Sequence, residues 1–180
     1  VDGGSTDNSR KAWENFAFQQ SKIISDKDYG IYDALNKGVS ISKGKYIQFL
    51  HSGDVFANKS VLSRIHEQLE KNKSEAIFGN LMHVSYKEGI PKVIRRWYPR
   101  QHSRWKYFYG WMVPHLSCTV KKTLFKKYGV FNIDYAIAGD YEWQLRVFFK
   151  NKVTPLYIDT EIVYLEIGGV SNSSIYNIIK

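Results

Sequence analysis

Lys45-Tyr-Ile-Gln-Phe-Leu-His-Ser-Gly-Asp54 is a hydrophobic run that leads into a short polar turn and ends in a carboxylate. The β-forming residues of the run predict a buried strand, and Gly53 followed by Asp54 predicts the turn after it. Open α/β sheets bind their ligands at the carboxyl ends of their strands. Asp54 is therefore the first candidate for a functional residue.

The sequence around this stretch alternates between strand-like and helix-like patterns. Apolar runs at residues 22–25 and 76–79 are typical of short strands, whereas residues 28–38 and 59–71 carry apolar side chains at helical spacing. A further helix is expected from residue 6 or 7 to about residue 18. This alternation predicts an α/β fold with a mostly parallel, doubly wound sheet and helices on both faces.

The second half of the chain has a different pattern. Residues 81–98 alternate in polarity about a turn that contains Gly and Pro, which predicts a β-hairpin. Residues 97–111 are rich in aromatic and basic side chains. The remaining expected elements are a helix over residues 139–149 and strands over residues 116–120, 154–158 and 162–165.

Composition indicates one folded domain. The chain has 180 residues, of which 43% are hydrophobic and 16% aromatic, so it can bury a core. Its single cysteine, Cys118, cannot form an intrachain disulfide, and we interpret it as a small buried residue rather than a reactive thiol.

The net charge and the hydropathy of the chain limit which kinds of partner and which cellular location we expect. The formal net charge of +9 favours negatively charged partners, which include nucleic acid, an anionic membrane face and a phosphorylated small molecule. No apolar run is long enough to span a bilayer, and no signal peptide opens the chain. We expect a cytoplasmic protein, with peripheral contact at the inner face of the membrane as an option.

Three acidic residues occupy similar turns: Asp2 after a strand end at residue 1, Asp54 after the central strand, and Asp140 at the start of a helix. Carboxylates gathered at one edge of a sheet suit a divalent cation that holds a phosphate ligand. Singly, Asp2 also fits a turn former and Asp140 a helix cap. The three together favour a site.

Four motifs, taken as a set, resemble glycosyltransferase family 2 of the GT-A fold, in the bacterial branch that builds colanic-acid-like and other surface polysaccharides. Their order and spacing are kept from residue 1 to about residue 171. The motifs are Asp2-Gly-Gly-Ser-Thr-Asp7, Asp28-Tyr-Gly-Ile-Tyr-Asp-Ala-Leu-Asn-Lys-Gly38, Gly44-Lys-Tyr-Ile-Gln-Phe-Leu-His-Ser-Gly-Asp54 and Gly139-Asp-Tyr-Glu142.

The resemblance implies a Rossmann-like GT-A domain over residues 1–180. Residues 1–80 would form the half that binds a nucleotide-sugar, and residues 81–180 the half that binds the acceptor. The first strand of the first half is expected to be missing, because the chain opens at a strand end. The implied reaction is an inverting transfer of a sugar from a nucleotide-diphosphate sugar to a glycan or lipid-linked acceptor in polysaccharide biosynthesis.

The resemblance also implies roles for the acidic turns. Asp54 takes the last position of the family's metal motif and would bind Mn²⁺ or Mg²⁺ at the donor diphosphate. Ser52 stands where the motif's first carboxylate usually lies, so the motif is left with one acid. Asp140 matches the catalytic base, which removes a proton from the acceptor hydroxyl. Glu142 is expected to be a helix-surface residue, with an exchange of roles with Asp140 as the alternative.

Further residues match donor-binding positions of the family. Asp2 lies in the turn that contacts the nucleoside. Asn36 and Lys37 match the helix that reaches the nucleotide, with Asp33 one turn ahead, although Lys37 also fits a solvated position. His115 is expected either to line the donor or acceptor pocket or to be a structural histidine.

Two alternatives to an enzyme remain open. The first is a GT-A remnant that binds a nucleotide-sugar or a glycan without turnover. The second takes residues 95–111 as a nucleic-acid surface, which the acidic turns disfavour. The arginines of this region either bind a lipid-linked pyrophosphate or a membrane face, or form a solvated edge; they are Arg95, Arg96, Arg100 and Arg104.

Overall fold

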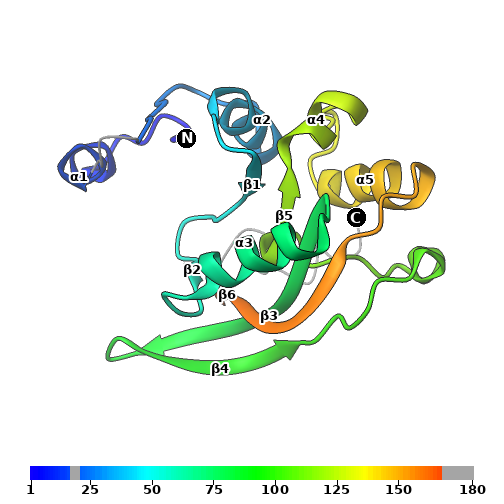
Figure 1. Ribbon diagram of the computed structural model, residues 1–180. Coiled ribbons are helices and arrows are strands. Elements are labelled where there is room, and N and C mark those ends of the chain that lie inside the picture. The colour runs from blue at the N-terminus through cyan, green and yellow to red at the C-terminus, as the bar shows by residue number, and fades with distance from the viewer. Residues whose placement is uncertain (17–20, 168–180) are drawn as a thin grey trace. The chain divides into compact units, whose positions relative to one another are not determined.

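The computed structural model of the protein describes residues 1–16 and 21–167, and Figure 1 shows its helices and strands. These residues form two compact units. Of the described residues, the first unit contains those within Val1–Ile47 and Lys121–Asn151, and the second contains Gln48–Val120 and residues 152–167. Each unit thus combines two stretches of sequence. The expected division at residue 80 into a donor-binding and an acceptor-binding half stays a prediction.

Helices dominate the first unit. Its predicted strand at residues 22–25 is reduced to a single parallel bridge between Asp2 and Ser25. The elements are α1 (Ser9–Phe16), α2 (Ile31–Ile41), α4 (Lys122–Tyr128), α5 (Gly139–Gln144) and the π-helical turn η3 (Leu145–Lys150) that continues α5.

Aromatic side chains of α4, α5 and the loop between them form the core of the first unit. The rings of Phe125 and Trp143 stack with centroids 4.7 Å apart, and Phe131 lies within 5.9 Å of both rings. The indole N–H of Trp143 donates to the carbonyl of Gly129 at 2.9 Å. Helix α5 is therefore fixed to the loop that precedes it.

The second unit is built on a sheet, and Figure 1 shows β3 and β4 as its long, curved ribbons. Helix α3 buries Val61, Ile65 and Leu69 on one side, as its apolar spacing predicts. The elements are β2 (Val55–Phe56), α3 (Val61–Asn72), β3 (Ala76–Lys87), β4 (Ile90–Trp97), η1 (Arg104–Tyr109), η2 (His115–Ser117), β5 (Cys118–Lys121) and β6 (Leu156–Glu166). The division between the units falls within the sequence of β1 (Tyr46–Gln48).

The α/β class is confirmed, but the described pairings make a mixed sheet rather than a mostly parallel one. β3 pairs in parallel with β6 and antiparallel with β4 and β5, and β2 pairs antiparallel with β6. The β3–β4 pair is the predicted hairpin. Its short turn at residues 88 and 89 allows only an antiparallel return.

Two pairs of expected strands are each one long strand. Residues 76–79 and 81–86 join in β3, and residues 154–158 and 162–165 join in β6. The β3–β6 register shifts between Phe78 and Asn80 and again between Asn80 and Leu81, which interrupts the alternation and explains the separate runs in the sequence. A Cβ added to Gly79 would lie 2.6 Å from the carbonyl oxygen of Thr160, so only glycine allows this close contact.

The structure also tests predictions for one helix, for the single cysteine and for membrane-spanning segments. Helix α3 is confirmed, and Cys118 is buried in β5, where burial raises the pKa of its thiol. None of the helices in the described chain is long and apolar enough to cross a bilayer. Residues 17 and 18 of the first predicted helix and residues 168–171 of the family resemblance lie outside the described residues.

Gly79→Ala is expected to lower the free energy of unfolding by about 2 kcal/mol, because the new methyl group meets the backbone of β6. Gly38→Ala is the matched control, since its Cβ would meet only Val1 at 3.6 Å and alanine favours a helix by up to about 1 kcal/mol. Urea denaturation followed by tryptophan fluorescence measures both changes. A neutral Gly79→Ala variant would contradict the close β3–β6 contact.

Candidate functional site

Asp140 lies in the first turn of α5 in the first unit and is half-buried. The preceding residue, Ala138, has a φ of 64°, an uncommon conformation for a residue with a Cβ, and it turns the chain sharply into the helix. The hydroxyl of Tyr32 on α2 donates a hydrogen bond to Oδ1 of Asp140 at 3.0 Å. The carboxylate therefore has a fixed position with a second oxygen available.

Gly139 makes the contact between Tyr32 and Asp140 possible. A Cβ at residue 139 would lie 2.8 Å from the ring of Tyr32, so a side chain there would push the ring away. Tyr32 is buried, and this burial, followed by the charge of Asp140, raises the pKa of Tyr32 to about 12. Tyr32 consequently keeps its proton at neutral pH and remains a hydrogen-bond donor to the carboxylate.

Glu142 has a different environment from Asp140. The guanidinium of Arg146 donates to both carboxylate oxygens of Glu142, at 2.9 and 2.8 Å. The same guanidinium also donates to the carbonyls of Tyr128 and Val130. Glu142 thus neutralises an arginine that holds the loop before α5, which supports the structural interpretation of Glu142 over the exchange of roles.

The predicted nucleotide-binding residues of α2 make contacts within the first unit. The side-chain amide of Asn36 donates to the carbonyl of Phe131 at 2.9 Å and accepts from its N–H at 3.0 Å. Lys37 forms an ion pair with Asp33 at 3.0 Å and donates to the carbonyl of Lys27. These contacts give Asn36 a role in holding the loop, and its contact with a nucleotide stays a prediction.

The carboxylate of Asp2 also accepts hydrogen bonds from nearby residues. It accepts from the N–H of Ser5 at 3.2 Å and from the hydroxyls of Ser5 and Ser25. The hydrogen bonds from the Ser5 and Ser25 hydroxyls lower the pKa of Asp2, so it is ionised at neutral pH. These hydrogen bonds fix the negatively charged carboxylate of Asp2 beside the parallel bridge between residues 2 and 25.

Asp54 lies in a tight turn of the second unit. Oδ2 of Asp54 accepts from the N–H of His51 at 3.1 Å, and the N–H of Asp54 donates to the carbonyl of His51 at the same distance. Gly53 closes the turn with a φ of 87°, which favours glycine. The carboxyl is half-buried, and burial raises the pKa of Asp54.

A second acid, Glu166, lies beside this turn, although no motif in the sequence marks it. A Cβ built on Gly53 would be 3.0 Å from Oε2 of Glu166, so the carboxylate of Glu166 lies against the turn. The antiparallel pairing of Val55 with Tyr164 brings the two segments together. The motif itself has one acid, and strand pairing brings a second acid beside it from far along the chain.

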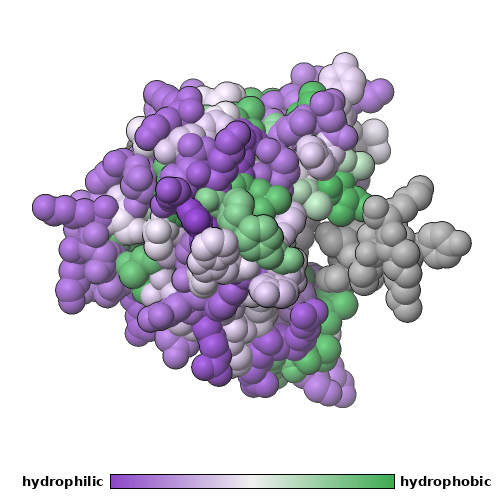
Figure 2. Space-filling model, turned by 90° about the vertical axis from the view of Figure 1, so that its right-hand side faces the viewer, coloured by the Kyte–Doolittle hydropathy of each residue, from purple (hydrophilic) through white to green (hydrophobic). Residues whose placement is uncertain are grey.

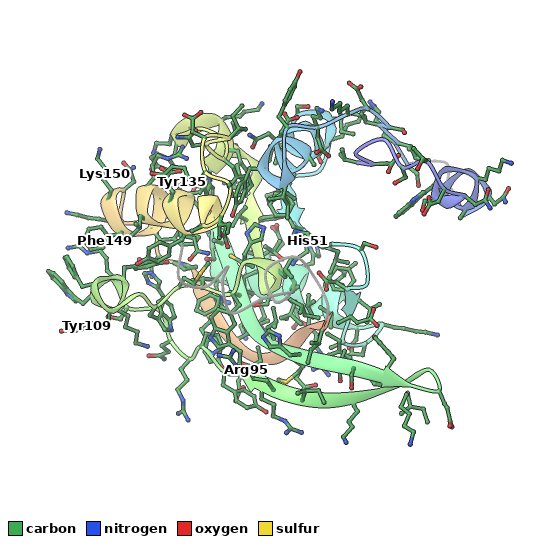
Figure 3. All side chains as sticks on the ribbon, turned by 180° about the vertical axis from the view of Figure 1, so that it is seen from behind. His51, Arg95, Tyr109, Tyr135, Phe149 and Lys150 are labelled. Atoms are coloured by element: carbon green, nitrogen blue, oxygen red, sulfur yellow. The ribbon has the colours of Figure 1, made fainter. Side chains whose placement is uncertain are left out.

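His51, which hydrogen-bonds within the Asp54 turn, lies near a second histidine, His115. The ring of His115, at the start of η2, stacks on Phe49 with centroids 5.1 Å apart, and the ring of His51 lies 6.2 Å from that of His115. Figure 3 labels His51 at this position. Ser52 is exposed at the turn. The structure thus groups three predicted residues of the second unit: Ser52, Asp54 and His115.

The Asp54 turn has the ligand chemistry of a magnesium or manganese site. Within residues 1–16 and 21–167, no three His, Cys, Asp or Glu side chains group as the ligands of one ion. A full protein cage is not required, because Mg²⁺ is usually bound through one or two carboxylates together with substrate phosphates and waters. Asp54, with Glu166 close by, fits this incomplete type of site.

Most of the chain matches a known protein family. The model of the family "Glycosyl transferase family 2" matches residues 1–129. A PGL/p-HBAD biosynthesis glycosyltransferase of Mycobacterium bovis (strain BCG / Pasteur 1173P2) is 27% identical over 185 residues, covering 96% of this chain and 66% of the relative. An uncharacterized glycosyltransferase of Mycobacterium tuberculosis (strain CDC 1551 / Oshkosh) is 31% identical over 152 residues, covering 81% of this chain and 55% of the relative.

A solved structure supports the fold. The structure of residues 1–349 of Staphylococcus aureus TarS in complex with UDP-GlcNAc has a TM-score of 0.75 and 15% sequence identity, covering 97% of this chain and 51% of that 1–349 chain. This likeness confirms the expected GT-A fold. The chain spans slightly less than two thirds of the mycobacterial relative and about half of the TarS 1–349 chain. On the family match over residues 1–129, the chain belongs to glycosyl transferase family 2.

Proposed function

We propose that this chain transfers a sugar, with inversion, from a nucleotide-diphosphate sugar to a glycan or lipid-linked acceptor. Family membership and the glycosyltransferase names of its relatives support an enzyme. They disfavour a remnant that only binds sugar nucleotides. The observation that carries the proposal is the carboxylate of Asp140, held at the start of α5 by the hydroxyl of Tyr32.

Asp140 acts as the general base in this proposal. Its carboxylate takes the proton of the acceptor hydroxyl while that oxygen bonds to the anomeric carbon of the donor. The bond from the anomeric carbon to the diphosphate oxygen breaks in the same step, so the configuration is inverted. Tyr32 keeps the carboxylate oriented and does not compete for the proton, because its own pKa is raised to about 12 by burial and by Asp140.

Asp54 holds a divalent cation, Mn²⁺ or Mg²⁺, in this proposal. When bound, the cation neutralises the negative charge that grows on the leaving diphosphate. The carboxylate of Glu166 adds negative charge beside the turn and strengthens the attraction for a cation. Ser52 and His115 are proposed to border the donor at the same turn.

A nucleoside diphosphate is the proposed common part of the donor. UDP is the first probe, because the similar protein TarS was solved with UDP and with UDP-GlcNAc. Asp2, Asp33, Asn36 and Lys37 are proposed to contact the nucleotide, with Asp2 facing the nucleoside. The acceptor is proposed to be a glycan or a lipid-linked molecule of polysaccharide biosynthesis, as the family resemblance implies.

Asp140→Asn is expected to reduce sugar transfer or donor hydrolysis by about 10²- to 10⁴-fold, because asparagine cannot accept the proton. Binding of UDP with Mn²⁺ should be unchanged. Asp134→Asn, which removes an exposed acid of the loop before α5, is the control and should retain activity. Radiolabelled sugar release measures all three proteins. Equal activity of the wild type and Asp140→Asn would refute the assignment of the base.

Asp54→Asn is expected to weaken Mn²⁺ binding in the presence of UDP by roughly tenfold or more, because a charged ligand is lost. Glu166→Gln should weaken it by a smaller factor, since Glu166 acts beside the turn. Glu88→Gln, at the exposed β3–β4 turn, removes the same charge elsewhere in the unit. Isothermal titration calorimetry compares the variants. Unchanged Mn²⁺ affinity in Asp54→Asn would exclude Asp54 as a ligand.

Mn²⁺ affinity is expected to fall as the pH is lowered toward the raised pKa of Asp54, because burial favours the protonated carboxyl and a proton excludes the cation. The same raised pKa means that the buried charge costs stability at neutral pH and that this cost disappears as the pH falls. Titrations at several pH values test this. An Asp54→Asn variant with the same pH dependence would contradict the assignment.

A further inference from the structure

Residues 89–133 contain no aspartate or glutamate, although the chain has 17 acids in all. In the second unit this acid-free run covers β4, η1 and the segment between them. Positive charge therefore accumulates there without neutralisation along the chain. The basic residues of this segment are Lys92, Arg95, Arg96, Arg100, Arg104 and Lys106.

The same segment exposes large aromatic side chains. On η1, the exposed fractions are 62% for Trp105, 66% for Phe108 and 90% for Tyr109. Figure 3 shows Tyr109 at the outer end of η1, directed away from the ribbon. Figure 2 shows hydrophobic side chains gathered within a mostly hydrophilic face. We call these three aromatic residues and the six basic residues of the segment the basic aromatic patch.

The geometry of η1 holds the aromatic side chains in a common surface. The rings of Trp105 and Phe108 stack with centroids 5.8 Å apart, and the guanidinium of Arg104 lies 5.2 Å from the ring of Trp105. Tyr107 of the same turn is buried and anchors η1 to the unit. Exposed rings on an anchored turn remain accessible to a partner, with the guanidinium of Arg104 at their side.

β4 adds apolar residues to the patch region. Ile90 and Ile94 are 69% and 53% exposed; Lys92 lies between them, and Arg95 and Arg96 follow Ile94. Within the described chain β4 pairs with β3 alone, so its outer edge has no strand beside it. β4 thus presents aliphatic and cationic side chains to solvent.

We propose that the basic aromatic patch docks the protein on an anionic membrane surface. Aromatic and aliphatic side chains enter the boundary between headgroups and acyl chains, while lysine and arginine bind the anionic headgroups. Nucleic acid fits less well, because bases gain little from Ile90 and Ile94, and Trp105 and Phe108 already stack on each other. The inference stands apart from the proposed transfer reaction, and docking would place the enzyme beside a lipid-linked acceptor.

Cosedimentation with vesicles tests the proposal. The protein should bind vesicles of phosphatidylcholine mixed with phosphatidylglycerol, and not vesicles of phosphatidylcholine alone. Replacing both Arg95 and Arg96 by glutamine should weaken binding about 25-fold, since each cation near the surface contributes about fivefold. Replacing Phe108 and Tyr109 by serine should weaken it about tenfold or more.

Matched control variants distinguish an effect of the patch residues from an effect of losing any exposed cation or aromatic ring. Lys59→Gln with Lys71→Gln removes two exposed cations elsewhere in the unit, and Tyr29→Ser removes a tyrosine that is 82% exposed outside the patch. Both controls should bind vesicles as the wild type does. Quenching of Trp105 fluorescence by brominated lipid, absent in Trp105→Phe, reports insertion of the ring.

The outcomes are distinct. Loss of vesicle binding in both patch variants, with unchanged controls, supports the proposal. Equal binding by all variants, no vesicle binding by the wild type, or a preference for single-stranded oligonucleotide over anionic vesicles overturns it. UDP binding measured on the same samples separates the two hypotheses: a protein that binds UDP but no vesicles refutes only the membrane inference, and the reverse result refutes only the donor chemistry.

Discussion

The close approach of Gly139 to the ring of Tyr32 is the constraint on which the proposed catalytic centre depends. Without a Cβ at residue 139, the ring reaches the first turn of α5 and donates to Asp140. The left-handed Ala138 before it costs about 1 kcal/mol or more of local strain. The aromatic packing of Trp143 and the contacts of Asn36 with Phe131 hold the loop and α5 in place. These contacts keep the carboxylate fixed before any substrate binds.

The second unit uses strand pairing to bring acids together. Asp54 ends a turn that Gly53 closes, and the pairing of β2 with β6 brings Glu166 against that turn. The turn therefore carries more negative charge than the local motif indicates. In the proposed reaction, this charge attracts the cation that accompanies the diphosphate, and Asp140 accepts the proton of the acceptor hydroxyl.

Features with local causes could be predicted from the sequence. Helices α2 and α3 follow from apolar spacing, and the acidic turns follow from Gly and Asp after a strand. The α/β class and the β3–β4 hairpin were also predictable. The mixed sheet and Glu166 were not, because they depend on which distant strands pair. The burial of Tyr32 could have been predicted, because its spacing to Leu35 and Val39 indicates a buried helix face. Its hydrogen bond to Asp140 could not, because the two residues are 108 positions apart in the sequence.

The anomeric configuration of the released sugar tests the central claim, a single displacement with Asp140 as the base. Proton NMR at early times, before the anomers equilibrate, identifies the product of transfer or hydrolysis from a donor with an α-linked sugar, such as UDP-GlcNAc. One carboxylate base and one displacement predict the β product. An α product would require two displacements or another mechanism, and it would contradict the role of Asp140 as the base of a single inverting step.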